Sequence, residues 1–223
     1  GPGETKLEMD KRVIRGRIAD IKEQIEDVRK RRGVQRSKRQ EANIPVLSLV
    51  GYTNAGKSSL LNKVTGADVF VEDKLFATLD PVTRKIELPN QQEVLMTDTV
   101  GFIQKLPHHL VAAFRATLEE ISESDVLLHV VDASHPKAEE HCEAVFEVLK
   151  DLNVNDKPIV TVLNKVDVEE SAPMVTRLEH VYPVSVAVST VTGEGIDKLL
   201  STVQEILSQR RVTVEMLFAY GDP

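Results

Sequence analysis

Cysteine, tryptophan and long apolar runs are scarce or absent in this 223-residue chain. The single cysteine, Cys142, excludes an internal disulfide and a cysteine-based metal cage, which fits a reducing compartment. No run approaches the roughly 20 apolar residues that a membrane-spanning helix needs, and the sequence predicts no secretory signal. With no tryptophan and 4% aromatic residues, the core must be built from Val, Leu, Ile and Ala. These absences favour a cytoplasmic location and leave an organelle open.

The charge of the chain is unevenly distributed around its net value of −7. Residues 1–40 contain 13 Lys/Arg and 7 Asp/Glu, a balance of +6. The remainder contains 15 basic and 28 acidic residues, a balance of −13. Only the basic arm would therefore favour a polyanion.

Residues 4–32 of this arm are predicted to form one long helix. Apolar side chains recur there in steps of three and four once Lys11 is allowed to fill one position of the stripe, namely Leu7, Ile14, Ile18, Ile21, Ile25 and Val28. Such a narrow stripe seats another helix, which must lie on the rest of this chain, on another chain or in a missing part. The arm ends in a basic cluster consisting of Arg29, Lys30, Arg31, Arg32, Arg36, Lys38 and Arg39. This cluster is either a solvated helix end or a contact for nucleic-acid phosphates.

Beyond the boundary at residues 43–45, short apolar runs alternate with helical patterns. The expected strands are 46–50, 84–88, 93–98, 126–131, 158–163 and 184–188, and the expected helices are 57–64, 109–122, 136–152, 170–179 and 195–208. This alternation predicts an α/β domain, a mostly parallel six-stranded sheet with helices on both faces. The predicted domains are therefore 1–42, a basic helical segment; 43–209, the α/β domain; and 210–223, the start of a further domain.

Residues 51–58, Gly-Tyr-Thr-Asn-Ala-Gly-Lys-Ser, carry the strongest motif. They form a G-x-x-x-x-G-K-S phosphate loop between an expected strand and an expected helix. Its main-chain amides, from Asn54, Ala55, Gly56, Lys57, Ser58 and Ser59, would surround phosphate oxygens. Lys57 would bridge the outer phosphates, and the Ser58 hydroxyl would bind a magnesium ion.

A second phosphate contact is expected at residues 98–101, Asp-Thr-Val-Gly, after the strand at 93–98. Asp98, 40 residues beyond Ser58, would hold the metal through water, and Gly101 would bring a main-chain amide to the terminal phosphate. In the segment between the first helix and the second strand, an exposed threonine can supply another magnesium oxygen. Thr78 is the candidate and Thr83 the alternative. A segment that orders around the terminal phosphate acts as a switch.

Residues 164–167, Asn-Lys-Val-Asp, indicate which base is read. A carboxylate at Asp167 can accept both the N1–H and N2–H donors of guanine, whereas adenine would offer it an acceptor nitrogen. The Asn164 amide can serve the opposite edge of the base and tie this loop, which includes Lys165, to the phosphate loop. A further loop, Ser189, Thr190 and Val191, is expected to support the base through main-chain amides.

Taken together, these motifs resemble those of the translation-factor-like GTPases, and within them the HflX family. The cues are residues 51–62, the stretch 75–81 (Leu-Phe-Ala-Thr-Leu-Asp-Pro), the stretch 98–103 (Asp-Thr-Val-Gly-Phe-Ile) and the opening Gly-Pro-Gly-Glu-Thr with its basic helix. The resemblance covers essentially the whole chain. It implies a GTPase, with GTP, GDP and Mg²⁺ as ligands, that binds the large ribosomal subunit and its RNA and, in some members, splits stalled ribosomes. It also implies a fragment that lacks most of an N-terminal and most of a C-terminal domain.

Phe102 departs from the Ras-like pattern, which has a water-orienting Gln after the D-x-x-G glycine. Catalysis would then depend on Mg²⁺, on the side chain of Lys57, on main-chain donors such as the Gly101 amide, on Thr78 and on a partner. Val191 stands where related loops usually carry Lys. Asn54 suggests a K⁺ site, as in related GTPases, or it only shapes the loop. The alternative function is a nucleotide-gated RNA-binding or ribosome-assembly module with incidental hydrolysis. We expect a monomer, with self-association through helix 4–32 as an open alternative.

Overall fold

The computed structural model describes residues 44–66, 81–102, 121–154 and 156–209. The chain divides into two compact units, Gly1–Ile44 and Pro45–Pro223, and nearly all described residues belong to the second. The predicted helices 4–32 and 109–122 lie outside the described residues, apart from the last turn of the latter, and so does the segment 210–223. The domain boundaries therefore stay predictions.

The described residues form a six-stranded sheet with the strand order β2-β3-β1-β4-β5-β6. The strands are β1 (Val46–Gly51), β2 (Val82–Glu87), β3 (Glu93–Asp98), β4 (Val126–Asp132), β5 (Ile159–Asn164) and β6 (Ser185–Ala187). Neighbouring strands pair in parallel except β2 and β3, which form an antiparallel hairpin at one edge. The prediction of a mostly parallel α/β sheet is confirmed.

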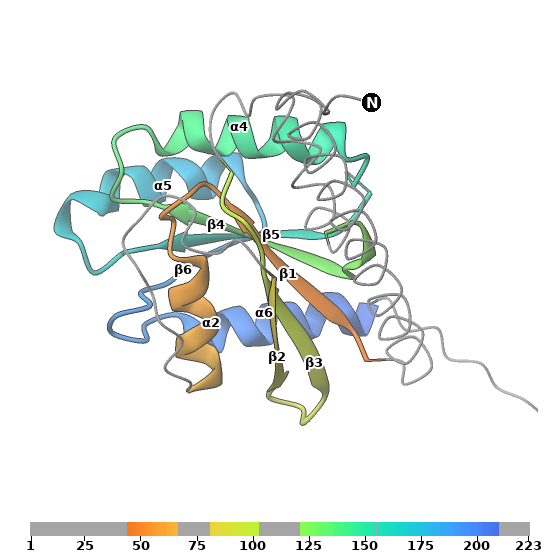
Figure 1. Cartoon of the computed structure of the whole chain (residues 1–223). Helices are drawn as coiled ribbons and strands as arrows, with labels where there is room; N and C mark the ends of the chain where they lie inside the picture. The colour runs from red at the N-terminus through yellow and green to blue at the C-terminus, as the bar shows by residue number, and fades with distance from the viewer. Residues whose placement is uncertain (1–43, 67–80, 103–120, 155, 210–223) are drawn as a thin grey trace, which may run out of the picture. The chain divides into compact units, whose positions relative to one another are not determined.

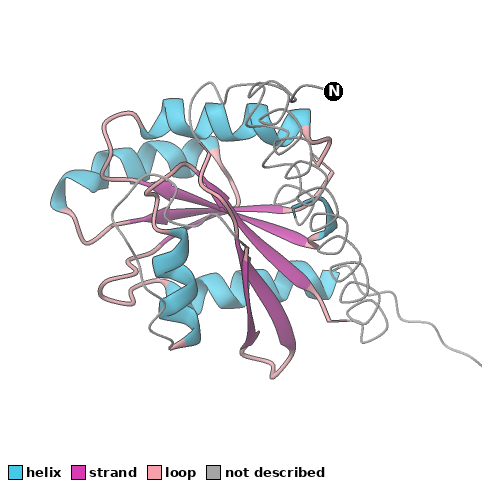
Figure 2. Ribbon diagram, in the orientation of Figure 1, coloured by secondary structure: helices cyan, strands magenta, loops and turns pink. Residues whose placement is uncertain are grey.

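Helices cover both faces of this sheet, as Figures 1 and 2 show. They are α2 (Lys57–Thr65), α4 (Ala138–Asp151), α5 (Ala172–Val181), which follows the short 3-10 helix η1 (Glu169–Ser171), and α6 (Ile196–Gln209). α2 and α6 lie on one face, and α4 and α5 lie on the other (Figure 1). The predicted helix 136–152 begins two residues later than expected, because a turn at 133–137 precedes it.

The alternation of side chains along the central strand separates two cores. Leu47 and Leu49 of β1 pack toward α2 and α6, whereas Val50 packs toward α4. All three are fully buried, and each such side chain contributes about 1.5–3 kcal/mol of hydrophobic stabilisation. Because both faces are covered, β4 is apolar almost throughout, as expected for a central parallel strand. Because β3, β1, β4 and β5 pair in parallel, their carboxyl ends meet at one edge of the sheet.

Candidate functional site

The phosphate loop at that edge depends on two residues with left-handed backbones. Gly56, with φ of 95°, stands immediately before α2, and Asn54 has φ of 61°. A Cβ on Gly56 would lie 2.2 Å from Asn164 Nδ2, and one on Gly51 would lie 2.3 Å from the Val130 carbonyl oxygen. Neither position has room for a side chain, so close packing requires glycine at both places, and at Gly56 the left-handed backbone requires it as well.

Lys57 is the first residue of α2, and its side chain is buried beneath the loop. Its Nζ donates to the main-chain carbonyls of Gly51, at 3.3 Å, and Tyr52, at 3.1 Å. Burial lowers the pKa of Lys57 to about 8, and the nearby Asp98 carboxylate opposes that shift. The loop therefore keeps a positive charge in a desolvated position next to a helix N-terminus, where the helix dipole also favours an anion.

Ser58 and Asp98 bring two oxygen-bearing side chains together. Ser58 Oγ donates to Asp98 Oδ2 at 2.5 Å. Asp98 ends β3, where it lies opposite Leu49 in the parallel pairing with β1. The following residue, Thr99, donates from Oγ1 to the Leu49 carbonyl at 2.6 Å and fixes the start of the turn. A hydroxyl and a carboxylate are hard oxygen donors of the kind that Mg²⁺ prefers.

Gly101 ends this turn directly against the phosphate loop. A Cβ on Gly101 would lie 2.7 Å from Thr53 Cα and 3.1 Å from Lys57 Nζ. Phe102 then pairs with the loop: its amide donates to the Gly51 carbonyl at 3.0 Å, and its carbonyl accepts from the Thr53 amide at 2.8 Å. The two phosphate motifs of the sequence are therefore adjacent main-chain segments.

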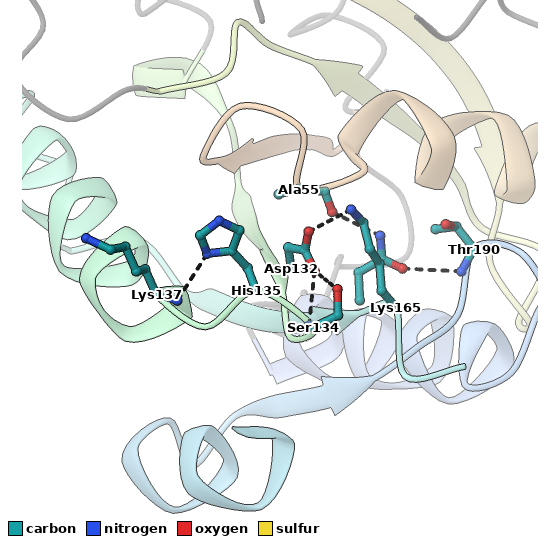
Figure 3. Close-up of polar contacts among 8 residues, drawn as sticks. Ala55, Asp132, Ser134, His135, Lys137, Lys165 and Thr190 are labelled. Carbon is teal, nitrogen blue, oxygen red and sulfur yellow. Dashed lines mark hydrogen bonds and ion pairs between the residues drawn. The ribbon is translucent and has the colours of Figure 1, made fainter. Parts of the chain in front are cut away.

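Asn164, at the end of β5, is completely buried and connects three loops. Its Nδ2 donates to the Ala55 carbonyl of the phosphate loop at 2.9 Å, and its Oδ1 accepts from the Thr190 amide at 3.3 Å. Figure 3 shows Ala55 and Thr190 on opposite sides of this connection. The predicted tie between the 164–167 loop and the phosphate loop is confirmed.

Lys165 and Asp167 extend from the same loop. Lys165, with φ of 68°, forms an ion pair with Asp132 at 2.6 Å (Figure 3). Asp167 is exposed and accepts from Ser189 Oγ at 2.6 Å. Ser189 is buried, and its Oγ also accepts from the Thr192 amide at 3.0 Å. The loop after β6 is thus fastened to the carboxylate predicted to read the base.

The structure places two of the three remaining candidate residues, Val191 and Thr83. The Val191 side chain is 75% exposed, while its carbonyl accepts from Lys63 Nζ of α2 at 3.1 Å. Thr78 lies outside the described residues. Thr83, the alternative, lies within β2 with its hydroxyl 2.9 Å from that of Thr97, so it belongs to the sheet.

Several residues at this edge were not predicted from the sequence. Asp132 ends β4, where its Oδ1 also accepts from the Ser134 amide and hydroxyl. Its only signal was a polar residue after an apolar strand. A cavity of about 360 Å³ lies beside the phosphate loop, and its lining includes Tyr52, Asn54, His129, His135 and His141.

His129, on β4, forms part of the cavity wall and is buried. Burial, followed by the charge of Lys57, lowers the pKa of His129 to about 3, so the imidazole is neutral at physiological pH. Its Nδ1 has no hydrogen-bond partner among the residues that the structure describes. Phe146 packs edge-on against the ring, with centroids 5.0 Å apart. Nearby Cys142 packs in a hydrophobic core cluster, and this burial raises the pKa of its thiol to about 12.

In the described part of the chain, no cluster of three or more His, Cys, Asp or Glu side chains is placed to hold a metal ion. No helix in the described ranges is long and apolar enough to cross a membrane.

Two similar solved structures contain a guanine nucleotide. The complex of SsGBP with GDP aligns with a TM-score of 0.63 and 27% identity, over 92% of this chain and 64% of that one. A variant of Era from Aquifex aeolicus, bound to GDP and AlF4⁻, aligns with a TM-score of 0.60 and 25% identity, over 79% and 60%. The fold and the phosphate loop define this chain as a P-loop NTPase G domain.

Sequence comparison identifies the family. The family described as 50S ribosome-binding GTPase matches residues 46–165, and the one described as GTP-binding GTPase Middle Region matches residues 1–39. GTPase HflX of Chlamydia pneumoniae is 50% identical over 222 residues, covering 100% of this chain and 47% of that protein. GTPase HflX of Escherichia coli K12 is 47% identical over 209 residues, covering 93% and 49%. The chain belongs to the HflX family of these GTPases, as its motifs predicted, and it spans about half the length of the curated relatives it matches.

Proposed function

We propose that this chain binds GTP together with Mg²⁺, hydrolyses it to GDP and phosphate, and acts as a nucleotide switch on the large ribosomal subunit. The observation that carries the proposal is the double hydrogen bond of Asn164 to Ala55 and Thr190. It joins the loop suited to phosphates to the two loops suited to a guanine base. A protein with unrelated motifs at separate places would have no need of that buried connection.

The phosphate end of the nucleotide would lie against the amides of residues 54–59. Lys57, held by two carbonyls in the described conformation, would turn to the outer phosphates, which are stronger acceptors than a peptide carbonyl. Gly101 lies close to the lysine, and its amide would contact the terminal phosphate. These groups would stabilise negative charge as the terminal phosphoryl group transfers to water.

Ser58 and Asp98 are the residues that would hold Mg²⁺, Ser58 directly and Asp98 through water. The short contact between their oxygens places a hard, oxygen-only donor pair beside Lys57, which fits this ion. When bound, the ion would neutralise charge on the phosphates. Thr78 stays our candidate for a further ligand that senses the terminal phosphate.

The base would be read by Asp167, with support from Asn164, Lys165 and the 189–191 loop. Asp167 is exposed, so it is accessible to a ligand, and its contact with Ser189 limits where the carboxylate can point. The ion pair between Lys165 and Asp132 fixes the lysine stem, an apolar surface on which a purine ring can rest.

Hydrolysis by the chain alone is expected to be slow. Phe102, in place of a water-orienting Gln, is 2% exposed and packs in the core beneath α4. Because this residue cannot orient water, a partner must reorder the surrounding segments. The family description as 50S ribosome-binding supports the large subunit as that partner.

The test is hydrolysis of GTP and of ATP by this chain across a titration of large ribosomal subunits. We expect slow hydrolysis of GTP alone and a rise in rate that saturates with the subunit. The matched control is Lys57→Ala, which should lose activity at every subunit concentration. An unchanged rate across the titration would refute the ribosomal switch, and the absence of GTP binding in calorimetry would refute the site.

A second candidate is a nucleotide-gated RNA-binding or assembly module whose hydrolysis is incidental. The basic balance of residues 1–40 favours it, because that arm would attract RNA phosphates. Deleting residues 1–42 separates the two functions. If subunit binding and stimulation persist, the arm is secondary; if both disappear, the arm is the working part.

We expect a cytoplasmic monomer, and sedimentation of the chain would reveal self-association through helix 4–32. A role in splitting ribosomes is part of the first proposal.

A further inference from the structure

Tyr52 of the phosphate loop stacks face to face on His141 of α4. Their ring centroids are 3.8 Å apart, and the planes are inclined by 3°. The centroid of the His141 ring also lies 4.4 Å from that of His135, which follows β4, with the two planes inclined by 37°. Burial, then the neighbouring His135, lowers the pKa of His141, while Glu140 and Asp132 oppose the shift and Lys137 adds to it. A neutral imidazole therefore faces the tyrosine ring at physiological pH.

The main chain of Tyr52 is central to the conformation of the loop. Its carbonyl accepts from Lys57 Nζ at 3.1 Å and from the Ala55 amide at 3.3 Å. Tyr52 also forms a parallel β-bridge with Phe102, the residue after Gly101. A shift of Tyr52 would consequently move both the lysine and the turn that faces it.

The phosphate loop borders a cavity, so the stacked pair of Tyr52 and His141 is important for holding the loop in place. Thr53, Asn54 and Ala55 border the cavity of about 360 Å³, and His129 and Cys142 lie on its wall. Where a loop borders a cavity, it loses the close packing that holds other segments in one position. Asn164 supports the loop at Ala55, whereas Tyr52 is supported from α4 by the stacked imidazole.

We propose that His141 is a positioning residue for the nucleotide site: its ring holds Tyr52 against α4 and thereby maintains the phosphate loop in the shape that retains a nucleotide. This proposal rests on the proposed function. It assigns α4 a role in setting nucleotide lifetime, although no residue of α4 belongs to the sequence motifs. The contact requires a flat ring at position 141 and does not require a charge.

The test measures the release of fluorescent N-methylanthraniloyl-GDP, chased by excess GDP, from the 223-residue chain and its variants. His141→Ala is expected to release GDP roughly three- to tenfold faster, the loss of one aromatic pair. His141→Phe keeps a flat ring and should stay within about twofold of the unaltered chain. His180→Ala, an exposed histidine on α5, is the matched control and should change nothing.

A double-mutant cycle with Tyr52→Leu distinguishes positioning from general destabilisation of α4. If the rings act together, the double variant releases GDP no faster than Tyr52→Leu alone. Multiplicative effects, or equal release by His141→Phe and His141→Ala, would overturn the proposal, and so would unchanged release in both Tyr52→Leu and His141→Ala. Should His141→Ala fail to fold, the comparison of Tyr52→Leu with Tyr52→Phe decides, since only the former loses the ring. Failure of the unaltered chain to bind GDP would overturn the proposed function and this proposal with it.

Discussion

Replacing Asn164 by alanine removes the side chain that joins the phosphate loop to the loop after β6. Asn164 is completely buried, and both of its hydrogen bonds reach main-chain atoms, Nδ2 to the Ala55 carbonyl at 2.9 Å and Oδ1 to the Thr190 amide at 3.3 Å. The substitution therefore leaves one acceptor and one donor without their side-chain partner in a place with little access to water.

The size of the effect follows from the two bonds. A buried group that loses its hydrogen-bond partner costs about 1–3 kcal/mol, and the longer contact to Thr190 belongs at or below the lower end of that range. We therefore expect the free energy of unfolding to fall by about 2–4 kcal/mol. Part of the loss should also appear in nucleotide affinity, because Ala55 belongs to the phosphate loop.

The assay is urea unfolding followed by circular dichroism, together with calorimetric titration with GDP. Gln209→Ala is the matched control, since Gln209 carries the same kind of amide group, is exposed at the end of α6 and should change stability by no more than about 0.5 kcal/mol. A loss below about 1 kcal/mol in Asn164→Ala with unchanged GDP affinity would show that Asn164 does not connect the loops energetically.

Three further predictions concern the base, the pH dependence of stability and the monovalent cation. Asp167→Asn should abolish the preference for GTP and favour xanthosine triphosphate, whose extra carbonyl needs a donor; retained GTP selectivity in competition binding would contradict the base-reading role. The pKa of His129 is about 3 in the fold and 6.5 when unfolded, so its stabilising contribution is complete above pH 6.5 and declines as pH falls toward 3. Between pH 7 and pH 5 the chain should lose about 2 kcal/mol more stability than His129→Leu, measured by urea unfolding, and parallel losses would exclude this origin. Hydrolysis of GTP should be faster in potassium than in sodium chloride if Asn54 helps to hold K⁺, and equal rates would leave Asn54 with only the loop-shaping role.

Local motifs made much of this protein predictable from its sequence. The phosphate loop needs glycine where a side chain would strike Asn164 or Val130, so the same residue types must recur at fixed spacing. Among the described residues, the alternation of apolar runs with helical patterns predicted the strands and helices to within about two residues, because in-out periodicity is a local property of each element. The sequence located two features less accurately: the start of β2, which pairs with β3 in an antiparallel hairpin, and the start of α4, which follows a turn. Hairpins and turns have weaker sequence patterns than strands and helices.

The motifs predicted that Asn164 ties its loop to the phosphate loop, but only the tertiary structure showed other contacts between distant side chains. Asp132 and Lys165 are 33 residues apart, and the parallel pairing of β4 with β5 brings them to the same edge of the sheet. The sequence did not indicate that Tyr52 and His141 stack, because no sequence pattern links a tyrosine in a loop to a histidine on a distant helix. Their contact arises only when α4 packs across the sheet, since side-chain pairing between elements depends on the rotation and position of whole helices, which no local pattern specifies.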